Sequence, residues 1–347
     1  MKRDCKEVIG VPERIRIHFF FRKPRAGETY SLERLFDAII KEIPTDRFDV
    51  RRITCPLDSK GIARRILLML WAATQQGDLN HITGDISFIG ILMQRRRTVQ
   101  TIPDGRSLQR LTGFGRKAYE LLWVRLPLYR AGRITAISEA TRAEVEPYAR
   151  TGAKIRVIPC CVTINISKCE QEGLPVPPRI LQIGTMSNKN LERVIAALEG
   201  CVCVLVIIGP LSSHQRELLE KAKIVFENYV ALSNLEIVEQ YKQSTLLTFV
   251  STYEGFGLPI LEAQAVGRPV VTSDREPMKS VAGAGAICVS PEDVGEIKDA
   301  IREILSNKTK RNQLIDYGRE NVANYTPSKI AKSYCALYQE LLNERQG

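Results

Sequence analysis

Residues 246–263 read LLTFVSTYEGFGLPILEA, an apolar run followed by a glycine-containing loop and then a second apolar pattern. The run Leu246–Val250 has the length and composition of a buried strand. Proline is favoured in the first turn of a helix, so Pro259 marks where a helix begins, and Gly267 predicts where it ends. The stretch therefore predicts a strand, a tight loop and a helix, which is the repeating unit of parallel α/β sheets.

The same alternation of strands and helices continues on both sides of this unit and predicts a parallel sheet in each half of the chain. The expected strands are Arg14–Phe21, Asp49–Ile53, Leu79–Thr83, Arg97–Ile102, Ile134–Ile137, Ile155–Ile158, Arg179–Ile183, Val202–Ile208, Lys223–Glu227, Leu246–Val250, Pro269–Thr272 and Ala286–Val289. The expected helices are Leu32–Ile43, Gly61–Gln75, Ser87–Met93, Gly115–Arg125, Glu139–Ala149 (capped by Ser138), Asn190–Leu198, Ser213–Lys221, Asn234–Gln243, Pro259–Val266, Val294–Ser306, Lys308–Tyr317 and Pro327–Asn343.

A stretch rich in proline and glycine, residues 171–178, interrupts this pattern and predicts a linker. It separates an amino-terminal domain, 1–170, from a carboxyl-terminal domain, 179–347, each long enough for its own core. Both domains are predicted to be doubly wound sheets, which bind ligands at the carboxyl ends of their strands. Two such domains facing each other would open both crevices onto one cleft.

The composition excludes several classes of protein. With 44% hydrophobic and 26% charged residues the chain is a folded protein, and no apolar run approaches the roughly 20 residues of a membrane-spanning helix. No secretory signal is expected at the N-terminus. Nine cysteines without a C-x-x-C pair, and only three histidines, predict free buried thiols in a reducing cytosol and no zinc site.

The net charge of +11 resides in the first half of the chain, where residues 1–178 hold 31 Lys and Arg against 19 Asp and Glu. Basic clusters at 22–25, 64–65 and 95–97 are compatible with a nucleic acid, an anionic membrane surface or solvated loops. No nucleic-acid-binding motif accompanies them, so no nucleic acid is expected as a partner. A basic group close to anionic lipid gains about 1 kcal/mol, which keeps a membrane surface among the expected partners.

The loop before Pro259 has the features of a phosphate site. Gly255 and Gly257 let the backbone approach a ligand closely, and the N–H groups that begin a helix present partial positive charge. Glu254 and Glu262 are eight residues apart, one in the loop and one about a turn into the helix, so both can face one bound molecule. Because a carboxylate beside a phosphate is unfavourable, these side chains are expected to accept bonds from the hydroxyls of a sugar or ribose. A helix cap or a solvated glutamate explains either residue alone, but not the whole segment.

The string EGFGLPILE, from Glu254 to Glu262, resembles the E-x7-E signature of retaining, nucleotide-sugar-dependent glycosyltransferases of family four, which have the GT-B fold. Further segments resemble the same family, more specifically in the carboxyl-terminal half than in the amino-terminal half. They are Ile183-Gly184-Thr185, Asn188-Lys189-Asn190-Leu191, Ile207-Ile208-Gly209, Gly267–Ser273, His81–Asp85 and Thr135–Glu139. The resemblance implies two Rossmann-like, doubly wound domains that face each other across a cleft, with the C-terminal helix packing back toward the amino-terminal domain. It also implies that the amino-terminal domain, 1–170, binds the acceptor and that the carboxyl-terminal domain, 179–347, binds the nucleotide sugar.

The resemblance also implies a role for each residue that matches a family motif. Glu262 would hold the ribose hydroxyls of the donor, and Glu254 would contact hydroxyls of the transferred sugar. Lys189 would neutralise the diphosphate as it leaves, which suits a lysine in a loop after a strand. The other implied donor-binding residues are Gly184, Thr185 and Asn188, together with Gly255, Phe256, Gly257 and Leu258, around which backbone N–H groups would bind the diphosphate. Glu254, Lys189 and His81 are the expected catalytic residues.

In the amino-terminal half the resemblance points to Gly27, in the first strand-to-helix loop, and to His81, which ends a strand and is expected to point toward the cleft. An ordinary turn glycine and a hydrogen-bonded structural histidine explain these two residues equally well. The sequence departs from the family at Pro103, where relatives commonly have a histidine near the transferred sugar. An arginine that many relatives have beside the lysine is also missing, and Thr185 and Asn188 occupy the neighbouring places.

These observations predict an enzyme, a retaining hexosyltransferase that moves a hexose-like sugar such as mannose from a nucleoside diphosphate sugar to a glycan or lipid-linked acceptor in surface polysaccharide assembly. The chain has no D-x-D metal motif, and Asp293 is expected to start a helix, so we expect no metal and no cofactor beyond the donor substrate. The basic amino-terminal half favours a cytoplasmic protein at the inner face of a membrane. The sequence leaves open a non-catalytic sugar-nucleotide-binding homologue, and a nucleotide-sugar epimerase or hydrolase on the same fold.

Overall fold

The computed structural model describes residues 14–24, 31–105, 120–150, 152, 155–164 and 175–344. The strands of the amino-terminal half are β1 (Ile15–Phe21), β2 (Phe48–Thr54), β3 (Leu79–Thr83), β4 (Thr98–Ile102), β5 (Arg133–Ala136) and β6 (Ile155–Val157). Those of the carboxyl-terminal half are β7 (Arg179–Ile183), β8 (Val204–Ile208), β9 (Val225–Tyr229), β10 (Leu246–Phe249), β11 (Val270–Ser273) and β12 (Ala286–Val289). Each half forms one six-stranded parallel sheet, in the orders β2-β1-β3-β4-β5-β6 and β12-β11-β10-β7-β8-β9.

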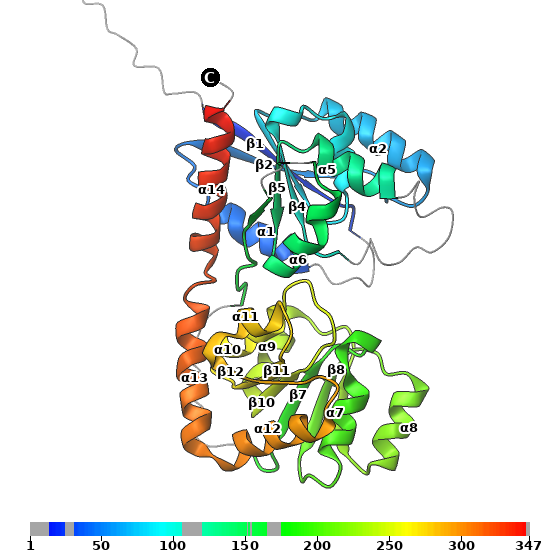
Figure 1. Cartoon of the computed structure of the whole chain (residues 1–347), viewed down its shortest axis with the longest axis vertical. Coiled ribbons are helices and arrows are strands. Elements are labelled where there is room, and N and C mark those ends of the chain that lie inside the picture. Colours follow the sequence, from blue (N-terminus) through cyan, green and yellow to red (C-terminus); the bar gives the residue numbers. More distant parts are fainter. Residues whose placement is uncertain are drawn as a thin grey trace, which may run out of the picture.

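Helices flank both sheets, and the two halves lie one above the other in Figure 1. The helices of the amino-terminal half are α1 (Ser31–Lys41), α2 (Ile62–Thr74), α5 (Leu126–Arg130) and α6 (Glu139–Val145). Those of the carboxyl-terminal half are α7 (Leu191–Leu198), α8 (Ser213–Lys221), α9 (Asn234–Gln243), α10 (Leu258–Ala265), α11 (Met278–Ala282), α12 (Val294–Ser306), α13 (Lys308–Val322) and α14 (Pro327–Asn343). The two doubly wound α/β sheets expected from the sequence are confirmed.

The strand order reverses at one place in each sheet, between β1 and β3 and between β7 and β10. At such a switch point the connections from the two neighbouring strands leave toward opposite faces, which opens a crevice at the carboxyl ends of the strands. In the second sheet this crevice is bounded by the loops after β7 and β10, residues 184–190 and 250–257. These are the two loops in which the sequence places most of the donor-binding residues.

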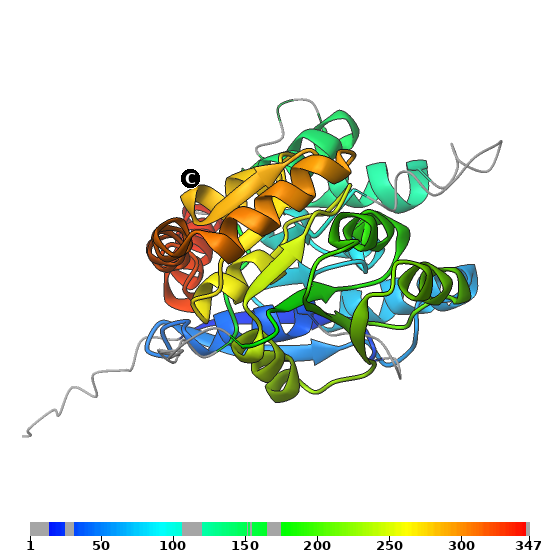
Figure 2. The ribbon, with the colours of Figure 1, turned by 90° about the horizontal axis from the view of Figure 1, so that it is seen from below.

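The last two helices run along one edge of the molecule. Figure 1 shows α13 beside the carboxyl-terminal sheet and α14 beside the amino-terminal sheet, and Figure 2 shows both at the same edge from below. On α14, Tyr338 packs edge-on against Phe19 of β1, and Tyr334 lies 5.9 Å from Phe36 of α1 between ring centroids. One apolar cluster therefore contains buried residues from both halves, and the predicted return of the C-terminal helix is confirmed.

Most differences from the expected elements have local causes. The helix expected over 139–149 ends at Val145, because Pro147 lies in a separate 3₁₀ turn. Residues 87–92 are wound as a 3₁₀ helix. In contrast, α13 runs past the expected end at Tyr317: Gly318 does not stop the helix but lets it pass close to the backbone of Gly285.

Two expectations fall partly outside the described residues. Of the helix expected over 115–125, the structure describes only the end, which is a π-helix over Leu121–Arg125 that leads into α5. The linker predicted at 171–178 begins inside the range 165–174, which is not described, so the domain boundary stays a prediction.

Candidate functional site

An ion pair and several hydrogen bonds join the loops that follow β7 and β10 at the crevice. The Nζ atom of Lys189 lies 2.6 Å from Oε1 of Glu254. The Asn188 side chain donates to the carbonyl of Tyr253 at 3.0 Å and to the same Glu254 oxygen at 3.3 Å. The backbone N–H of Thr252 donates to the Asn188 carbonyl at 2.8 Å. The structure thus brings together three of the residues expected to bind a donor.

The Lys189 side chain is held at the carboxyl ends of both strands. Its side chain and that of Glu254 are only 15% and 14% exposed, so their attraction acts in a lower dielectric than that of surface ion pairs. Gly184 has φ +88°, and a β-carbon there would lie 2.8 Å from Cγ of Lys189, so the lysine stem lies across the glycine. Nζ also lies 4.7 Å from the ring centroid of Phe249, where a cation is attracted to the aromatic face.

Asn190 determines where Lys189 lies. It is buried and has a left-handed backbone, φ 62°, which asparagine tolerates better than most residues. Its Nδ2 donates to the carbonyls of Val250 and Pro291 at 3.0 and 2.7 Å, and its Oδ1 accepts from Arg193 at 2.8 Å. The asparagine after the lysine therefore joins this loop to two neighbouring loops.

Helix α10 begins at the same crevice, at Leu258, with no side chain capping its N-terminus. Its N-cap residue, Gly257, has φ +108°, a conformation that residues with a β-carbon avoid. Phe256 is 5% exposed and packs edge-on against Tyr325, which anchors the loop in the core. The loop therefore presents the N–H groups and partial positive charge of a helix N-terminus beside Lys189, an arrangement that suits a diphosphate.

Glu262 is half-buried on α10 and accepts a hydrogen bond from the Tyr241 hydroxyl at 2.8 Å. Burial raises the pKa of the Glu262 carboxyl, while the bond from Tyr241 and the positive charge of Arg34 lower it. Burial also raises the pKa of Tyr241 well above its ordinary value, so the phenol stays a hydrogen-bond donor. Arg34 comes from α1 of the other half and also donates to the side chain of Asn234, so Glu262 lies where the two halves meet.

Gly255 touches the amino-terminal half directly. A β-carbon there would lie 2.4 Å from the carbonyl oxygen of Pro103 and 3.0 Å from Cβ of Asp104, so only glycine fits. The Gly255 carbonyl accepts hydrogen bonds from the hydroxyls of Ser138 and Thr141, at 2.8 and 3.3 Å. The loop expected to bind the donor is therefore also a contact between the domains.

Two more contacts hold that loop in place. Ser138 caps α6 as expected, since its Oγ accepts the N–H of Thr141 at 3.0 Å while it donates to the Gly255 carbonyl. The Tyr253 hydroxyl donates to Oε2 of Glu144, also on α6, at 2.9 Å. Residues of α6 and its N-cap therefore hold residues 253–255 by hydrogen bonds across the cleft.

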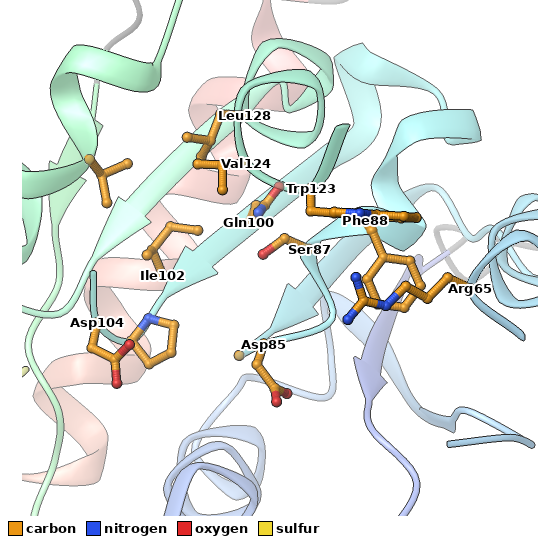
Figure 3. A pocket seen from close by; sticks show the side chains of 13 residues that line it. Arg65, Asp85, Ser87, Phe88, Gln100, Ile102, Asp104, Trp123, Val124 and Leu128 are labelled. Atoms are coloured by element: carbon orange, nitrogen blue, oxygen red, sulfur yellow. The ribbon is translucent and has the colours of Figure 1, made fainter. Parts of the chain in front are cut away.

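A pocket opens in the amino-terminal half beside this contact, and Pro103 and Asp104 form part of its wall (Figure 3). The residues that line it are Arg65, Gly84, Asp85, Ser87, Phe88, Gln100, Ile102, Pro103, Asp104, Trp123, Val124, Leu128 and Val145. A neighbouring hollow shares Gly84, Asp85, Pro103 and Asp104 with it. A molecule held in this pocket, which we call the amino-terminal pocket, would lie next to the loop of Glu254 and Gly255.

His81 does not face the cleft, and the prediction that it does is wrong. The ring is fully buried, with Nδ1 2.6 Å from the Tyr338 hydroxyl and Nε2 2.7 Å from the Thr101 hydroxyl. Burial lowers its pKa to about 3, so the imidazole is neutral. Side chains of a strand alternate between its two faces, and His81 lies on the face of β3 that α14 covers. It is a structural histidine in the core.

Of the two remaining residues expected to bind the donor, the structure describes one. Thr185 lies at the crevice, but its hydroxyl donates to the carbonyl of Pro210 at 2.5 Å and its own carbonyl accepts from Gln215 at 2.8 Å. Gly27 lies outside the described residues.

Sequence reasoning missed the side chains that support the site from a distance, namely Tyr241, Arg34 and Glu144. Tyr241 fits the apolar spacing of a helix, and Arg34 belongs to no motif, so no local signal marks either of them. Their roles depend on which helices pack against α10 and its loop.

Other kinds of site find no support in the described part of the chain. There, no three His, Cys, Asp or Glu side chains gather closely enough to hold a metal ion. The seven cysteines within that part are free thiols. None of the helices that the structure describes combines the length and apolar character needed to cross a membrane.

The fold has known counterparts. HepE of Anabaena, solved in complex with UDP and glucose, superposes with a TM-score of 0.73 at 14% identity, covering 94% of this chain and 100% of that chain. Two parallel Rossmann-like sheets facing across a cleft define the GT-B fold, and the chain has this fold, as expected.

The sequence comparisons concern mainly the carboxyl-terminal domain. Residues 170–321, less than half of the chain, match the family model described as glycosyl transferases group 1. The O-antigen chain mannosyltransferase RfbU of Salmonella typhimurium is 26% identical over 260 residues, which cover 70% of this chain and 71% of that protein. The D-inositol 3-phosphate glycosyltransferase of Corynebacterium urealyticum is 31% identical over 108 residues, or 30% of this chain and 26% of that protein, so the match spans about a quarter of that relative.

Proposed function

We propose that the chain is a retaining glycosyltransferase that moves a hexose-like sugar, such as mannose, from a nucleoside diphosphate sugar to a glycan or lipid-linked acceptor. The supporting observation is the line of contacts that runs from Lys189 through Glu254 and Gly255 to Pro103 and Asp104. It joins groups that suit a diphosphate and a sugar to a pocket of the opposite domain. Transfer between two substrates requires them to be held in contact in this way.

In this proposal Lys189 and the N-terminus of α10 meet the charge that develops on the leaving diphosphate. Both are positive and preorganised, so they stabilise that charge without rearrangement. The lysine ammonium has three donors and can bind the diphosphate and Glu254 together. Glu254 would then accept bonds from hydroxyls of the transferred sugar, and Glu262, held by Tyr241, from the ribose hydroxyls.

We assign no protein nucleophile to the reaction. The acceptor hydroxyl attacks the anomeric carbon on the face from which the diphosphate leaves, its proton passes to the leaving oxygen, and the configuration is retained. Because Lys189 and α10 supply the positive charge, we propose that the reaction requires no metal and no cofactor besides the donor. The hydrogen bonds between α6 with its N-cap and residues 253–255 would keep the two domains closed and exclude water from the cleft during transfer.

Two relatives support the choice of substrates. The Salmonella relative is named an O-antigen chain mannosyltransferase, which favours a hexose transferred to a surface polysaccharide. The HepE structure contains UDP and glucose, which favours a nucleoside diphosphate sugar as donor.

A thermal-shift screen against UDP, GDP and ADP and their sugars tests the donor site, since a ligand that binds the folded state raises the melting temperature. One nucleotide and its sugar are expected to stabilise the protein. Lys189→Ala and Glu262→Gln are expected to abolish the shift, while Lys332→Ala, on the exposed face of α14, keeps it. Unchanged shifts in both site variants would place the donor elsewhere.

Product analysis distinguishes the proposed transferase from the two alternative functions. The first alternative, a non-catalytic homologue, is suggested by Pro103, which offers no side-chain hydrogen bond at the domain contact. Such a protein would bind the nucleotide sugar and form no product with any acceptor. An epimerase or hydrolase would convert the nucleotide sugar without an acceptor, so chromatography of reactions with and without acceptor identifies it.

We also propose that the protein is cytoplasmic and binds the inner face of a membrane through α2. This helix exposes a stripe of large apolar side chains, and a monomer rarely leaves such a face in water. They are Ile62, Ile66, Leu67 and Leu70, with exposed fractions of 68%, 46%, 55% and 54%. Lys60 and Arg64, also exposed, add the positive charge that anionic lipids attract.

Vesicle co-sedimentation tests this membrane contact. The protein is expected to bind vesicles that contain phosphatidylglycerol at low salt, less at high salt, and hardly at all as the variant Ile66→Glu with Leu70→Glu. Leu235→Glu, which alters an 83% exposed leucine on α9, is the matched control and should bind as the parent does. Equal binding by all three proteins would rule out α2 as the contact.

A further inference from the structure

A second pocket of the amino-terminal half, which we call the arginine pocket, has Arg95, Arg133, Arg150 and Glu344 in its lining. Arg95 precedes β4 and Arg133 begins β5, whereas the carboxyl end of β4 leads to Pro103 at the domain contact. Because β4 and β5 are parallel, the arginine pocket lies at the end of the sheet that faces away from the cleft. Figure 1 shows the C-terminal end of α14, which Glu344 follows, on that side of the molecule.

Three guanidinium groups gather in the arginine pocket from separate parts of the chain. Arg95 belongs to a 3₁₀ turn, Arg133 to β5, and Arg150 follows α6 and its 3₁₀ turn. Like charges repel, so this gathering is unfavourable unless an anion offsets it. Among the lining residues that the structure describes, Glu344 alone is acidic, which leaves an excess of positive charge. The amino-terminal pocket has the reverse balance, with two aspartates and one arginine.

The side chain of Arg95 has no counter-ion. Arg95 is half-buried, and its guanidinium lies 5.9 Å from the ring centroid of Tyr129 but pairs with no carboxylate in the described ranges. Its Nε atom is enclosed by protein and has no hydrogen-bond partner there, whereas the two Nη atoms are not enclosed in this way. A partly desolvated cation without a partner is unfavourable, and the Nη groups are the part of it that a ligand can reach.

The backbone holds two of the three arginines together before any ligand arrives. A β-carbon on Gly132 would lie 2.2 Å from the carbonyl oxygen of Arg95, so only glycine fits at this contact. The Gly132 N–H donates to the carbonyl of Thr98 at 2.9 Å, and the Gly132 carbonyl accepts from Nη1 of Arg133 at 2.9 Å. The pocket is therefore preorganised, which lowers the free energy that a ligand must supply to order it.

The ion pair of Arg133 shows that the pocket accepts an oxyanion. Nη2 of Arg133 pairs with a carboxylate oxygen of Glu344, and the two side chains are 16% and 57% exposed. Because the Glu344 side chain lies mostly in solvent, it can give way to a stronger ligand without disturbing the core. A phosphate is such a ligand: guanidinium groups bind two of its oxygens at once, and its oxygens accept where arginine only donates.

We propose that the arginine pocket binds a phosphate group, which the three arginines hold and which displaces Glu344 from Arg133. A free phosphate or phosphate monoester and the headgroup of a lipid both offer this chemistry. The site is separate from the donor crevice, so the proposal goes beyond the proposed function and does not depend on it.

Isothermal titration calorimetry with inorganic phosphate and glycerol 3-phosphate, at constant ionic strength in chloride buffer, tests the soluble ligands. All proteins carry Lys189→Ala, which removes the cation expected to hold a diphosphate at the donor crevice. Saturable binding is expected, and Arg95→Ala should raise its Kd about tenfold. Arg302→Ala, which alters an exposed arginine on α12, is the matched control and should keep the parent Kd.

Glu344→Gln tests the displacement of the carboxylate. Because the variant removes the negative charge that competes for Arg133, its Kd for phosphate should fall about threefold. An unchanged or higher Kd would show that phosphate and Glu344 do not compete. Thermal melts without phosphate check the fold: Arg95→Ala loses no ion pair to a described residue, so its melting temperature should match that of Arg302→Ala.

Vesicles distinguish a lipid from a free phosphate as the ligand. Phosphatidic acid vesicles are compared with phosphatidylcholine vesicles, in the Ile66→Glu, Leu70→Glu background that removes the proposed contact of α2. Binding to phosphatidic acid that Arg95→Ala abolishes assigns the lipid headgroup, whereas binding of the soluble probes alone assigns a free phosphate. Equal binding by Arg95→Ala and Arg302→Ala, or no binding of either kind of probe, overturns the proposal.

Discussion

A β-carbon on Gly255 would lie 2.4 Å from the carbonyl oxygen of Pro103, well inside the distance at which atoms repel. The glycine after Glu254 is therefore needed for the contact between the two domains. The resemblance implies only a donor-binding role for Gly255, and the structure adds this separate reason for a glycine.

Gly255→Ala is expected to lower kcat/KM for transfer by about 10²-fold, because a shift of about 1 Å between the domains misaligns donor and acceptor. Steady-state kinetics and a thermal melt measure this. Gly200→Ala is the control: it has φ +75° but open space around it, so it should lose about 1–2 kcal/mol of stability and no activity. Parent-like kinetics for Gly255→Ala would show that the contact is not needed.

Tyr241→Phe removes the hydrogen bond that holds Glu262. We expect the donor KM to rise about five- to tenfold, the equivalent of about 1 kcal/mol, with kcat within twofold. Tyr317→Phe, on the exposed part of α13, should change neither constant. A fall in kcat with an unchanged KM would contradict a role in donor binding.

Asn190 combines two donated hydrogen bonds with a left-handed backbone. Asn190→Ala loses both donated bonds and has a strained backbone, so we expect its free energy of unfolding to be about 3 kcal/mol below that of the parent. Asn190→Gly loses the bonds without the strain, so its free energy of unfolding should be about 1 kcal/mol higher than that of Asn190→Ala. Urea denaturation of both variants measures the difference. If the Ala variant proved at least as stable as the Gly variant, backbone strain at this position would be excluded.

His81 makes stability depend on pH. Its pKa is about 3 in the folded protein and 6.5 ordinarily, so on acidification the unfolded chain takes up this proton first. The stabilisation is complete above pH 6.5 and is lost as the pH falls toward 3, at up to about 1.4 kcal/mol per pH unit. Urea denaturation at several pH values between 7 and 4 should show a free energy of unfolding that falls less steeply with decreasing pH in His81→Gln than in the parent. Equal pH dependence in the parent and in His81→Gln would refute this role of His81.

The order of the elements and the identity of the crevice loops are local properties, and they could be predicted. Strand and helix periodicities, and signals such as Ser138 before α6, involve neighbouring residues only. Parallel strands with helical connections leave their loops at one sheet edge, and the resemblance implied that Lys189 and Glu254 bind parts of one donor. In the structure their charged atoms are 2.6 Å apart.

The side chains that complete the site depend on contacts between distant parts of the chain. Ser138 and Gly255 are 117 residues apart, and His81 and Tyr338 are 257 apart. Neither separation leaves a periodic trace, so the face on which His81 lies depended on where α14 packs.

By itself, then, the sequence determined the α/β architecture, the element order and the phosphate-suited loop at residues 254–258, because hydrophobic period, glycine and proline act over a few residues. Only the tertiary structure decided that Gly255 lies in close contact with Pro103. It also decided that Glu262 accepts a hydrogen bond from Tyr241 and feels the charge of Arg34. The burial of the Gln100 amide without a partner in the described chain is a third such property. These properties arise from the packing of one domain or helix on another, which no local pattern specifies.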